Sequence, residues 1–235
     1  MTGPRNLDVP GCVNLRDLGG YTTRRGEVLA PGRLFRSAEF PVAAEPAAGL
    51  VRVTGVRRVV DLRMDEEVEK SGAPAFPEGC EWIRLPLFQT VPAHWPTSIT
   101  RTPPSTAARY FEMTEIGTRT IARVVELLGD VESKPTLIHC VAGRDRTGIV
   151  VACVLDLVDV PDATIGADYA LSSMMDDAEG RTAHPDNIVL LLQLIRERFG
   201  SVREMLVGAG AEATPLPRQD QHPHVRGAGQ RRAGA

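Results

Sequence analysis

The sequence predicts an α/β fold in one domain: a central, mostly parallel sheet of four to five strands flanked by helices, with a helical and proline-rich lid insertion. Three observations support this fold class. Short β-rich apolar runs alternate with longer segments of helical spacing, which is typical of parallel sheets. One such run leads through a glycine-containing loop into an apolar helix. With 235 residues, 43% of them hydrophobic, the chain can bury a substantial core.

The first part of the chain supplies short strands and short helices. Turn residues mixed with apolar pieces predict a small strand or hairpin early in the chain. Proline at the start of one helix and glycine after its end agree with the usual asymmetry of helix ends. The expected elements are a strand or hairpin within 11–40, a helix at Pro46–Val53 that stops at Gly55, a strand at 57–63, an acidic helix at 65–70 and a strand at 80–87.

The second part of the chain is mainly helical after an interruption. Residues 89–105 hold four prolines and no acidic residue, so they form either a lid over a site or a plain surface loop. The expected elements are helices at 106–113, 118–128, 161–173 and 185–199, a strand at 136–138, a helix from Gly148 onward and a short helix capped by Ser201 and Glu204. Periodicity is lost after Gly210, which predicts a domain at 1–210 and a disordered tail at 211–235.

The stretch 135–158 contains the most informative pattern, with HCVAGRDRTG between strand and helix. This arrangement directs backbone N–H groups and a helix N-terminus at an anion. Cys140 lies beside the helix N-terminus and arginines, which favours the nucleophilic thiolate, and we expect His139 to bind loop backbone and support that state. Arg146 can grip two phosphate oxygens with its planar guanidinium. The Thr147 hydroxyl could donate to the sulfur.

Cys-x5-Arg, preceded by His and followed by Thr-Gly, resembles the signature of the cysteine-dependent protein tyrosine phosphatase superfamily. The loop is most similar to the bacterial and fungal branch, in which a basic residue and an aspartate precede the arginine. Arg144 stands where that branch usually has lysine. Two further stretches resemble the branch, NLRDLGGY at 14–21 and DYALS at 168–172, so the resemblance covers about residues 7–208.

The resemblance implies a phosphatase that hydrolyses phosphomonoesters through a cysteinyl-phosphate intermediate, without metal or cofactor. Its expected partner is a phosphorylated protein carrying phosphotyrosine, with phosphoserine, phosphothreonine or phosphoinositides as alternatives. Inorganic phosphate or vanadate should occupy the same loop. Cys140 and Arg146 would be catalytic. The residues expected to bind substrate are His139, Val141, Ala142, Gly143, Arg144, Thr147 and Gly148.

The sequence does not decide which residue protonates the leaving oxygen. The tripeptide at 95–97, Trp-Pro-Thr, resembles the Trp-Pro-Asp loop of familiar tyrosine phosphatases without its carboxylate, and no acidic residue lies between Glu81 and Glu112. Asp145 is the first candidate for the acid, and Asp61 at a strand end is the second. In the alternative, Asp145 only caps the helix and pairs with an arginine.

Several arginines outside the catalytic pair have two interpretations. Arg16 with Asp17 either forms a structural salt bridge beside the loop or contacts substrate, and Arg36 with Ser37 has the same alternatives. Arg144 would place a second guanidinium at the rim of the anion site, where a doubly phosphorylated ligand would benefit.

Composition limits which binding partners and which cellular compartment we expect for this protein. A net charge of -3 gives no reason to expect nucleic acid. The sequence has neither a signal peptide nor a run of 18 apolar residues, which predicts a cytoplasmic protein without a transmembrane segment, export by a route without a signal peptide being left open. The cysteines lack the C-x2-C spacing of a zinc site. Cys12 or Cys80 is an alternative resolving thiol for an oxidised Cys140.

Overall fold

The computed structural model describes residues 6–95, 102–130, 134–175 and 182–210, so the expected tail at 211–235 and part of the proline-rich insertion, 96–101, lie outside the described residues. In chain order the elements are β1 (Arg16–Asp17), β2 (Leu34–Ser37), α1 (Ala44–Thr54), β3 (Arg58–Asp61), α2 (Asp65–Ser71), β4 (Glu81–Arg84), α3 (Pro103–Gly129), β5 (Thr136–His139), α4 (Asp145–Leu157), α5 (Asp162–Ala170), the 3-10 helix η1 (Leu171–Met175), α6 (Asp186–Phe199) and α7 (Val202–Gly208).

The strands form one five-stranded sheet in the order β1-β2-β5-β3-β4. Four strands are parallel and only β1 pairs antiparallel, which confirms the predicted fold class. The last residue of β5, His139, lies between Ser37 of β2 and Asp61 of β3. Three strands therefore end at the same edge of the sheet, where ligand sites of parallel sheets gather. The loop after β5 emerges at the centre of that edge.

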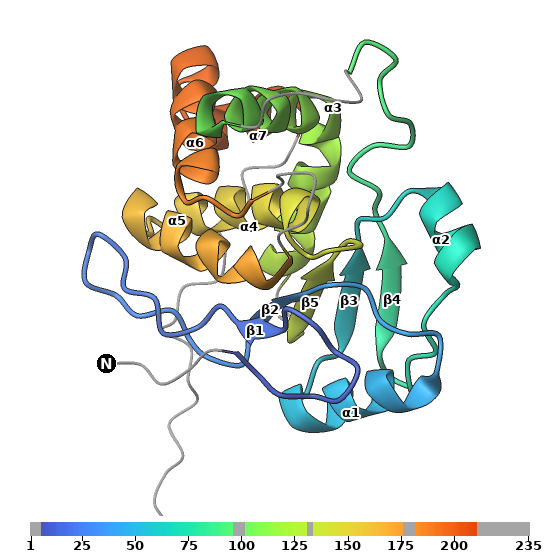
Figure 1. Cartoon of the computed structure of the whole chain (residues 1–235). Coiled ribbons are helices and arrows are strands. Elements are labelled where there is room, and N and C mark those ends of the chain that lie inside the picture. The colour runs from blue at the N-terminus through green and yellow to red at the C-terminus, as the bar shows by residue number, and fades with distance from the viewer. Residues whose placement is uncertain (1–5, 96–101, 131–133, 176–181, 211–235) are drawn as a thin grey trace, which may run out of the picture.

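Successive side chains of the central strands β3 and β5 point to opposite faces of the sheet, and both faces are buried. Val60 and Ile138 point into the larger core, which α3 to α7 cover, whereas Val59 and Leu137 point into a smaller cluster with Leu50 of α1. Figure 1 shows α1 on one side of the sheet and α3, α4, α5, α6 and α7 on the other. Because both faces are covered, the strands are apolar on both sides, as expected for parallel strands between helices.

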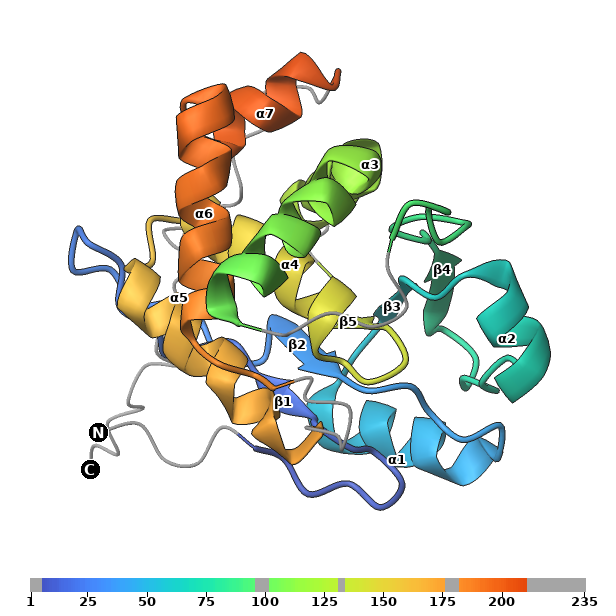
Figure 2. The same ribbon diagram turned by 45° about the horizontal axis from the view of Figure 1, so that its top comes forward.

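Two helices differ from the sequence prediction in ways that matter for the site. α3 is one helix of 27 residues where the sequence predicted two, because Gly117 continues the helix and its missing side chain leaves room for Leu87, which packs against the position that a Cβ atom would occupy. α4 begins at Asp145 and not at Gly148, which places Arg146 in its first turn. Figure 2 shows α6 beside α3 and α5, the helices it packs against.

The remaining elements follow the sequence prediction closely. α1 begins two residues before Pro46 and ends at Gly55, whose φ of 70° is the left-handed conformation expected at a helix C-terminus. Across the described ranges, no helix has both the length and the apolar character needed to cross a bilayer.

Replacing Ser201 tests the predicted cap of α7. The Ser201 hydroxyl accepts a hydrogen bond from the Glu204 amide at 3.0 Å. Ser201→Ala should lower the free energy of unfolding by about 1 kcal/mol, because an orphan N–H group of the first turn loses its acceptor. Ser201→Asn, which can still accept that bond, is the control in a urea denaturation series. Equal stability of the alanine variant and the wild type would contradict the cap.

Candidate active site

The loop 140–144 between β5 and α4 has its carbonyl groups bound by surrounding donors. When the carbonyls are held this way, the N–H groups of the loop face the opposite side, which is the arrangement of an anion cradle. The bonds are His139 Nδ1 to Cys140 O at 3.1 Å, Glu39 N to Val141 O at 2.9 Å, Asn14 Nδ2 to Ala142 O at 3.1 Å and to Gly143 O at 3.2 Å, Arg36 Nη2 to Gly143 O at 2.8 Å, and Gly148 N to Arg144 O at 2.8 Å.

Two glycines of the loop motif are required by close packing. Gly143 has φ of 65°, and a Cβ atom there would collide with the carbonyl oxygen of Ser37. At Gly148 a Cβ atom would lie 2.8 Å from the ring of Tyr169. The backbone of the loop and of the first turn of α4 therefore approaches β2 and α5 more closely than any residue with a side chain allows.

A buried ion cluster on Asp168 holds the donors of the loop. Arg16 Nε donates to Asp168 Oδ1 at 3.0 Å and Arg36 Nη1 to Oδ2 at 2.7 Å. Arg16 also donates to the side-chain oxygen of Asn14, whose amide group in turn binds the loop. Arg16 therefore pairs with Asp168, not with Asp17. The two stretches that resembled the phosphatase branch outside the loop meet at this carboxylate.

The cluster is charged although it is fully buried. Arg16, Arg36 and Asp168 are each at most 2% exposed. Burial would raise the pKa of Asp168, but the two guanidinium groups hold it below its ordinary value. Burial and the neighbouring Arg36 lower the pKa of Arg16 to about 10. Two positive groups thus share one negative group beneath the loop, which favours a bound anion.

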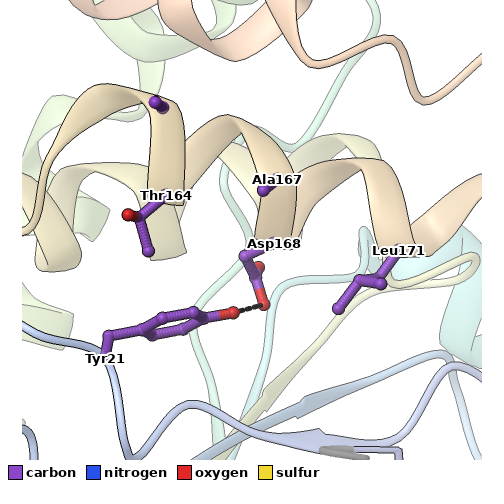
Figure 3. A pocket seen from close by; sticks show the side chains of 6 residues that line it. Tyr21, Thr164, Ala167, Asp168 and Leu171 are labelled. Carbon is purple, nitrogen blue, oxygen red and sulfur yellow. Dashed lines mark hydrogen bonds between the residues drawn. The ribbon is translucent and has the colours of Figure 1, made fainter. Parts of the chain in front are cut away.

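A shallow hollow of about 380 Å³ lies along α5 near this cluster. Figure 3 shows the Tyr21 hydroxyl pointing at Asp168, to which it donates a hydrogen bond of 2.8 Å. The other lining residues are Ala163, Thr164, Ala167 and Leu171. The hollow contains neither the expected nucleophile nor a cation, and Tyr21 supports the loop through its hydrogen bond to Asp168.

The expected nucleophile and its arginine come together. Cys140 is 2% exposed and its thiol is free. Arg146 lies close enough to Cys140 for the two groups to interact electrostatically: burial lowers the pKa of Arg146, but Glu67 and the sulfur raise it above its ordinary value. The Thr147 hydroxyl is buried and has no partner within the described parts of the chain. It is therefore available to a thiolate or to a bound anion.

Glu67 of α2 is a site residue that the sequence did not indicate. Its two carboxylate oxygens accept hydrogen bonds from Nη1 and Nη2 of Arg146, the latter at 2.7 Å. This contact uses the end of the guanidinium and leaves its side edge, Nε with an outer N–H, for phosphate oxygens. Burial would raise the pKa of Glu67, but Arg146 holds it below its ordinary value. The sequence feature that could have pointed to Glu67 is the acidic helix that directly follows the end of a strand.

Asp145 lies in the first turn of α4 with its side chain 31% exposed. Tyr110 of α3 donates its hydroxyl to Oδ1, and Arg144 Nε lies 3.3 Å from the same oxygen. Pairing with an arginine is thus observed, together with a tyrosine contact that the sequence did not indicate. Arg144 itself is only 2% exposed and donates to the Met175 carbonyl, so its guanidinium does not stand exposed at the rim as expected.

Asp61 lies behind the loop in a second buried ion cluster. It is 0% exposed and accepts from Arg63 Nε at 3.0 Å and Nη2 at 2.7 Å. Burial would raise the pKa of Asp61, but Arg63 holds it below its ordinary value. His139 Nε2 lies 3.7 Å from the same carboxylate, and burial lowers the pKa of this histidine. These groups brace the end of β5.

Two of the other cysteines lie away from Cys140. Cys12 and Cys80 pack against the smaller cluster on the α1 side of the sheet, whereas Cys140 belongs to the larger core. Burial raises the pKa of both thiols to about 11, which disfavours the thiolate needed for disulfide exchange. All four cysteines are free, Cys153 being buried in α4.

The beginning of the proline-rich insertion flanks the site. The ring of Phe88 lies 5.8 Å from the guanidinium carbon of Arg146 and 5.6 Å from the ring of Trp95. Trp95 donates to Glu112 of α3 and carries Arg109 over its face at 4.3 Å. The carboxylate near this tryptophan therefore comes from α3 and is already bound.

Comparison with known proteins gives the class of the protein. Residues 7–215 match the sequence model of the tyrosine phosphatase family, so the chain belongs to that family. It is 32% identical over 195 residues to the triple specificity protein phosphatase PtpB of Mycobacterium tuberculosis, which covers 71% of this chain and 68% of PtpB. The tyrosine-protein phosphatase of Nostoc commune is 29% identical over 161 residues, 61% of this chain and 55% of that protein.

The solved structures to which the chain is similar are more distant in sequence. The crystal structure of P. aeruginosa TpbA is 14% identical and covers 88% of this chain and 95% of that chain, with a TM-score of 0.42. A second TpbA structure, of a cysteine-to-serine variant in complex with pTyr, is 13% identical and covers 90% of this chain and 100% of that chain, with a TM-score of 0.41.

Replacing Glu67 tests whether α2 aligns Arg146. Glu67→Gln removes the negative charge and one acceptor oxygen, so the guanidinium loses a charge-assisted pair. We expect kcat/KM for an aryl phosphate to fall about 10- to 100-fold, the equivalent of one such bond. Glu66→Gln makes the same charge change at an exposed neighbour on α2 and is the control. An unchanged kcat/KM in Glu67→Gln would remove Glu67 from the site.

Proposed function

We propose that this protein hydrolyses phosphotyrosine and related phosphomonoesters through a cysteinyl-phosphate intermediate at Cys140. The observation that carries the proposal is the loop 140–144 with its carbonyls tied back, Cys140 within it and Arg146 beside the sulfur.

The first step is displacement at phosphorus by the thiolate. A bond forms between sulfur and phosphorus as the ester oxygen leaves in line, while Arg146 and the loop N–H groups bind the three equatorial oxygens, which carry the charge of the transition state. The Thr147 hydroxyl, buried without a partner in the described structure, can stabilise the sulfur. In the second step water attacks phosphorus, and the thiolate is regenerated with release of inorganic phosphate.

We assign the general acid to Asp145. Its partly exposed carboxyl group is adjacent to Arg146 in the first turn of α4, so it can protonate the leaving oxygen and later accept a proton from water. Asp61 has no exposed surface, and Arg63 donates to both of its carboxylate oxygens. Its carboxyl group therefore cannot reach the leaving oxygen of a bound ester, so we give Asp61 the role of bracing β5.

Phosphotyrosine is the substrate class that we put first. Vanadate or phosphate should compete for the same cradle. Because one relative is a triple specificity phosphatase, phosphoserine, phosphothreonine and phosphoinositides should be tested too. Arg144, however, is buried and donates to a backbone carbonyl, so at this position the site lacks a second exposed guanidinium for a doubly phosphorylated lipid. We place the reaction in the cytoplasm, where a free catalytic thiol stays reduced.

Replacing the nucleophile tests the proposed reaction. Cys140→Ser should abolish hydrolysis of p-nitrophenyl phosphate and phosphotyrosine peptides, because a serine hydroxyl is not ionised at neutral pH. Phosphate release is measured without added metal and with vanadate as competitor. Cys12→Ser is the control, since this half-buried thiol lies on the other side of the sheet. Wild-type turnover by Cys140→Ser would exclude the mechanism.

Replacing the proposed acid should give a loss that depends on the leaving group. Asp145→Asn cannot donate a proton, so we expect turnover of an alkyl phosphate to fall about 10²- to 10⁴-fold, with a much smaller loss for p-nitrophenyl phosphate, whose leaving group needs little assistance. Asp186→Asn, an aspartate in the first turn of α6, is the control. Equal small losses on both substrates would show that the acid lies elsewhere.

A further inference from the structure

The two oxygens of the Asp145 carboxylate have different surroundings. Oδ1 accepts the Tyr110 hydroxyl and lies 3.3 Å from Arg144 Nε. Oδ2 has a longer contact of 3.5 Å to Arg144 Nη2. Oδ1 is therefore fixed against the protein by a tyrosine and an arginine. Oδ2 is the less tightly held oxygen of the two.

The hydroxyl groups behind Asp145 have a defined direction. Tyr110 has a single O–H and gives it to Asp145, so Tyr169 is the donor in the 2.8 Å contact between the two tyrosines. Asn187 Nδ2 lies 3.4 Å from the Tyr169 oxygen and donates to it. These hydrogen bonds form a row from Asn187 on α6 through the tyrosines of α5 and α3 to Asp145 in the first turn of α4. Each donated hydrogen points toward the Asp145 carboxylate.

The two tyrosine hydroxyl groups are buried and stay protonated. Tyr110 is 4% exposed and Tyr169 is 1% exposed, and their rings pack edge to face at 6.3 Å. Burial and the charge of Asp145 raise the pKa of Tyr110 well above its ordinary value and that of Tyr169 to about 12. Both phenols are therefore donors at any pH at which the enzyme works.

We propose that Tyr110 is a positioning residue for the acid: it holds Asp145 by Oδ1, so that the catalytic proton is carried on Oδ2. This inference rests on the proposed role of Asp145. When the proton on Oδ2 passes to the ester oxygen, the bonding pair stays on Asp145, and the carboxylate that forms keeps the Tyr110 hydrogen bond. That bond is stronger to the carboxylate than to the neutral acid.

Because the Tyr110 hydrogen bond favours the ionised form of Asp145, its removal should shift the pH profile of kcat in a defined direction. Among the described residues, Arg144 in the loop, Arg146 on α4, Tyr110 on α3 and Tyr169 on α5 interact electrostatically with Asp145. Removing the Tyr110 hydroxyl leaves both arginines in place and takes away one donor to the carboxylate. The protonated form of the acid then persists to higher pH, so the alkaline limb of kcat moves upward.

Tyr110→Phe tests the proposal with phenyl phosphate, whose poor leaving group makes turnover depend on the acid. We expect the alkaline limb of the kcat profile to move up by about half to one pH unit, and kcat at the optimum to fall about tenfold because Oδ2 is no longer aligned. Tyr169→Phe should move the limb in the same direction by less, since it acts only through Tyr110.

Matched variants separate the possible results. Thr120→Val removes a hydroxyl group of α3 that donates to the Pro86 carbonyl at 2.9 Å and not to Asp145, and should leave the limb in place. Asp145→Asn should have no alkaline limb. An unmoved limb in Tyr110→Phe, with the limb absent in Asp145→Asn, overturns the proposal for Tyr110 alone. A wild-type limb in Asp145→Asn overturns the acid assignment and this inference together.

A folding defect would not leave the question open. Thermal denaturation checks each variant before assay. If Tyr110→Phe does not fold, Tyr169→Phe keeps Tyr110 in place, and a limb at the wild-type pH in that variant overturns the proposal.

Discussion

The buried contact of Asp168 with two arginines is the interaction on which the site depends. Backbone carbonyls turn away from an anion only when donors elsewhere bind them. Arg36 supplies one such donor directly, and Arg16 orients the Asn14 amide that supplies another. Each guanidinium keeps its place because the buried Asp168 carboxylate compensates its charge. The loop is therefore shaped before a ligand arrives, and the excess positive charge of the cluster already favours an anion.

The sheet explains why the support comes from both sides of the nucleophile. β5 is the central strand, and its neighbours end at the same edge, so Arg36 near the end of β2 flanks the loop on one side and Asp61 at the end of β3 on the other. Asp61 and Arg63 neutralise each other next to His139. The chain thus buries several charges around one loop, and each of them has a partner.

The sequence was sufficient for the sheet and for the loop that holds Cys140 near Arg146, because those features are local: an apolar run, a glycine and a Cys-x5-Arg spacing. It did not indicate Glu67 or Tyr110, because each acts through a contact across more than 30 residues of chain. Arg144 was misplaced at the rim for the same reason, since its partner, the Met175 carbonyl, belongs to η1. Gly117 suggested a helix end, but a packing contact with Leu87 decided otherwise.

The position of the proposed acid, Asp145, has a consequence for the proposed mechanism. An acid on a separate loop reaches the leaving group only when that loop closes, whereas Asp145 shares the first turn of α4 with Arg146. The cradle, the guanidinium and the carboxyl group are then parts of one rigid segment whose geometry does not vary with closure. With Asp145 as the proposed acid, the insertion that contains Trp95 and follows Phe88 does not need to contribute an acidic residue. Its aromatic side chains can instead form the wall that decides which phosphate esters reach the sulfur.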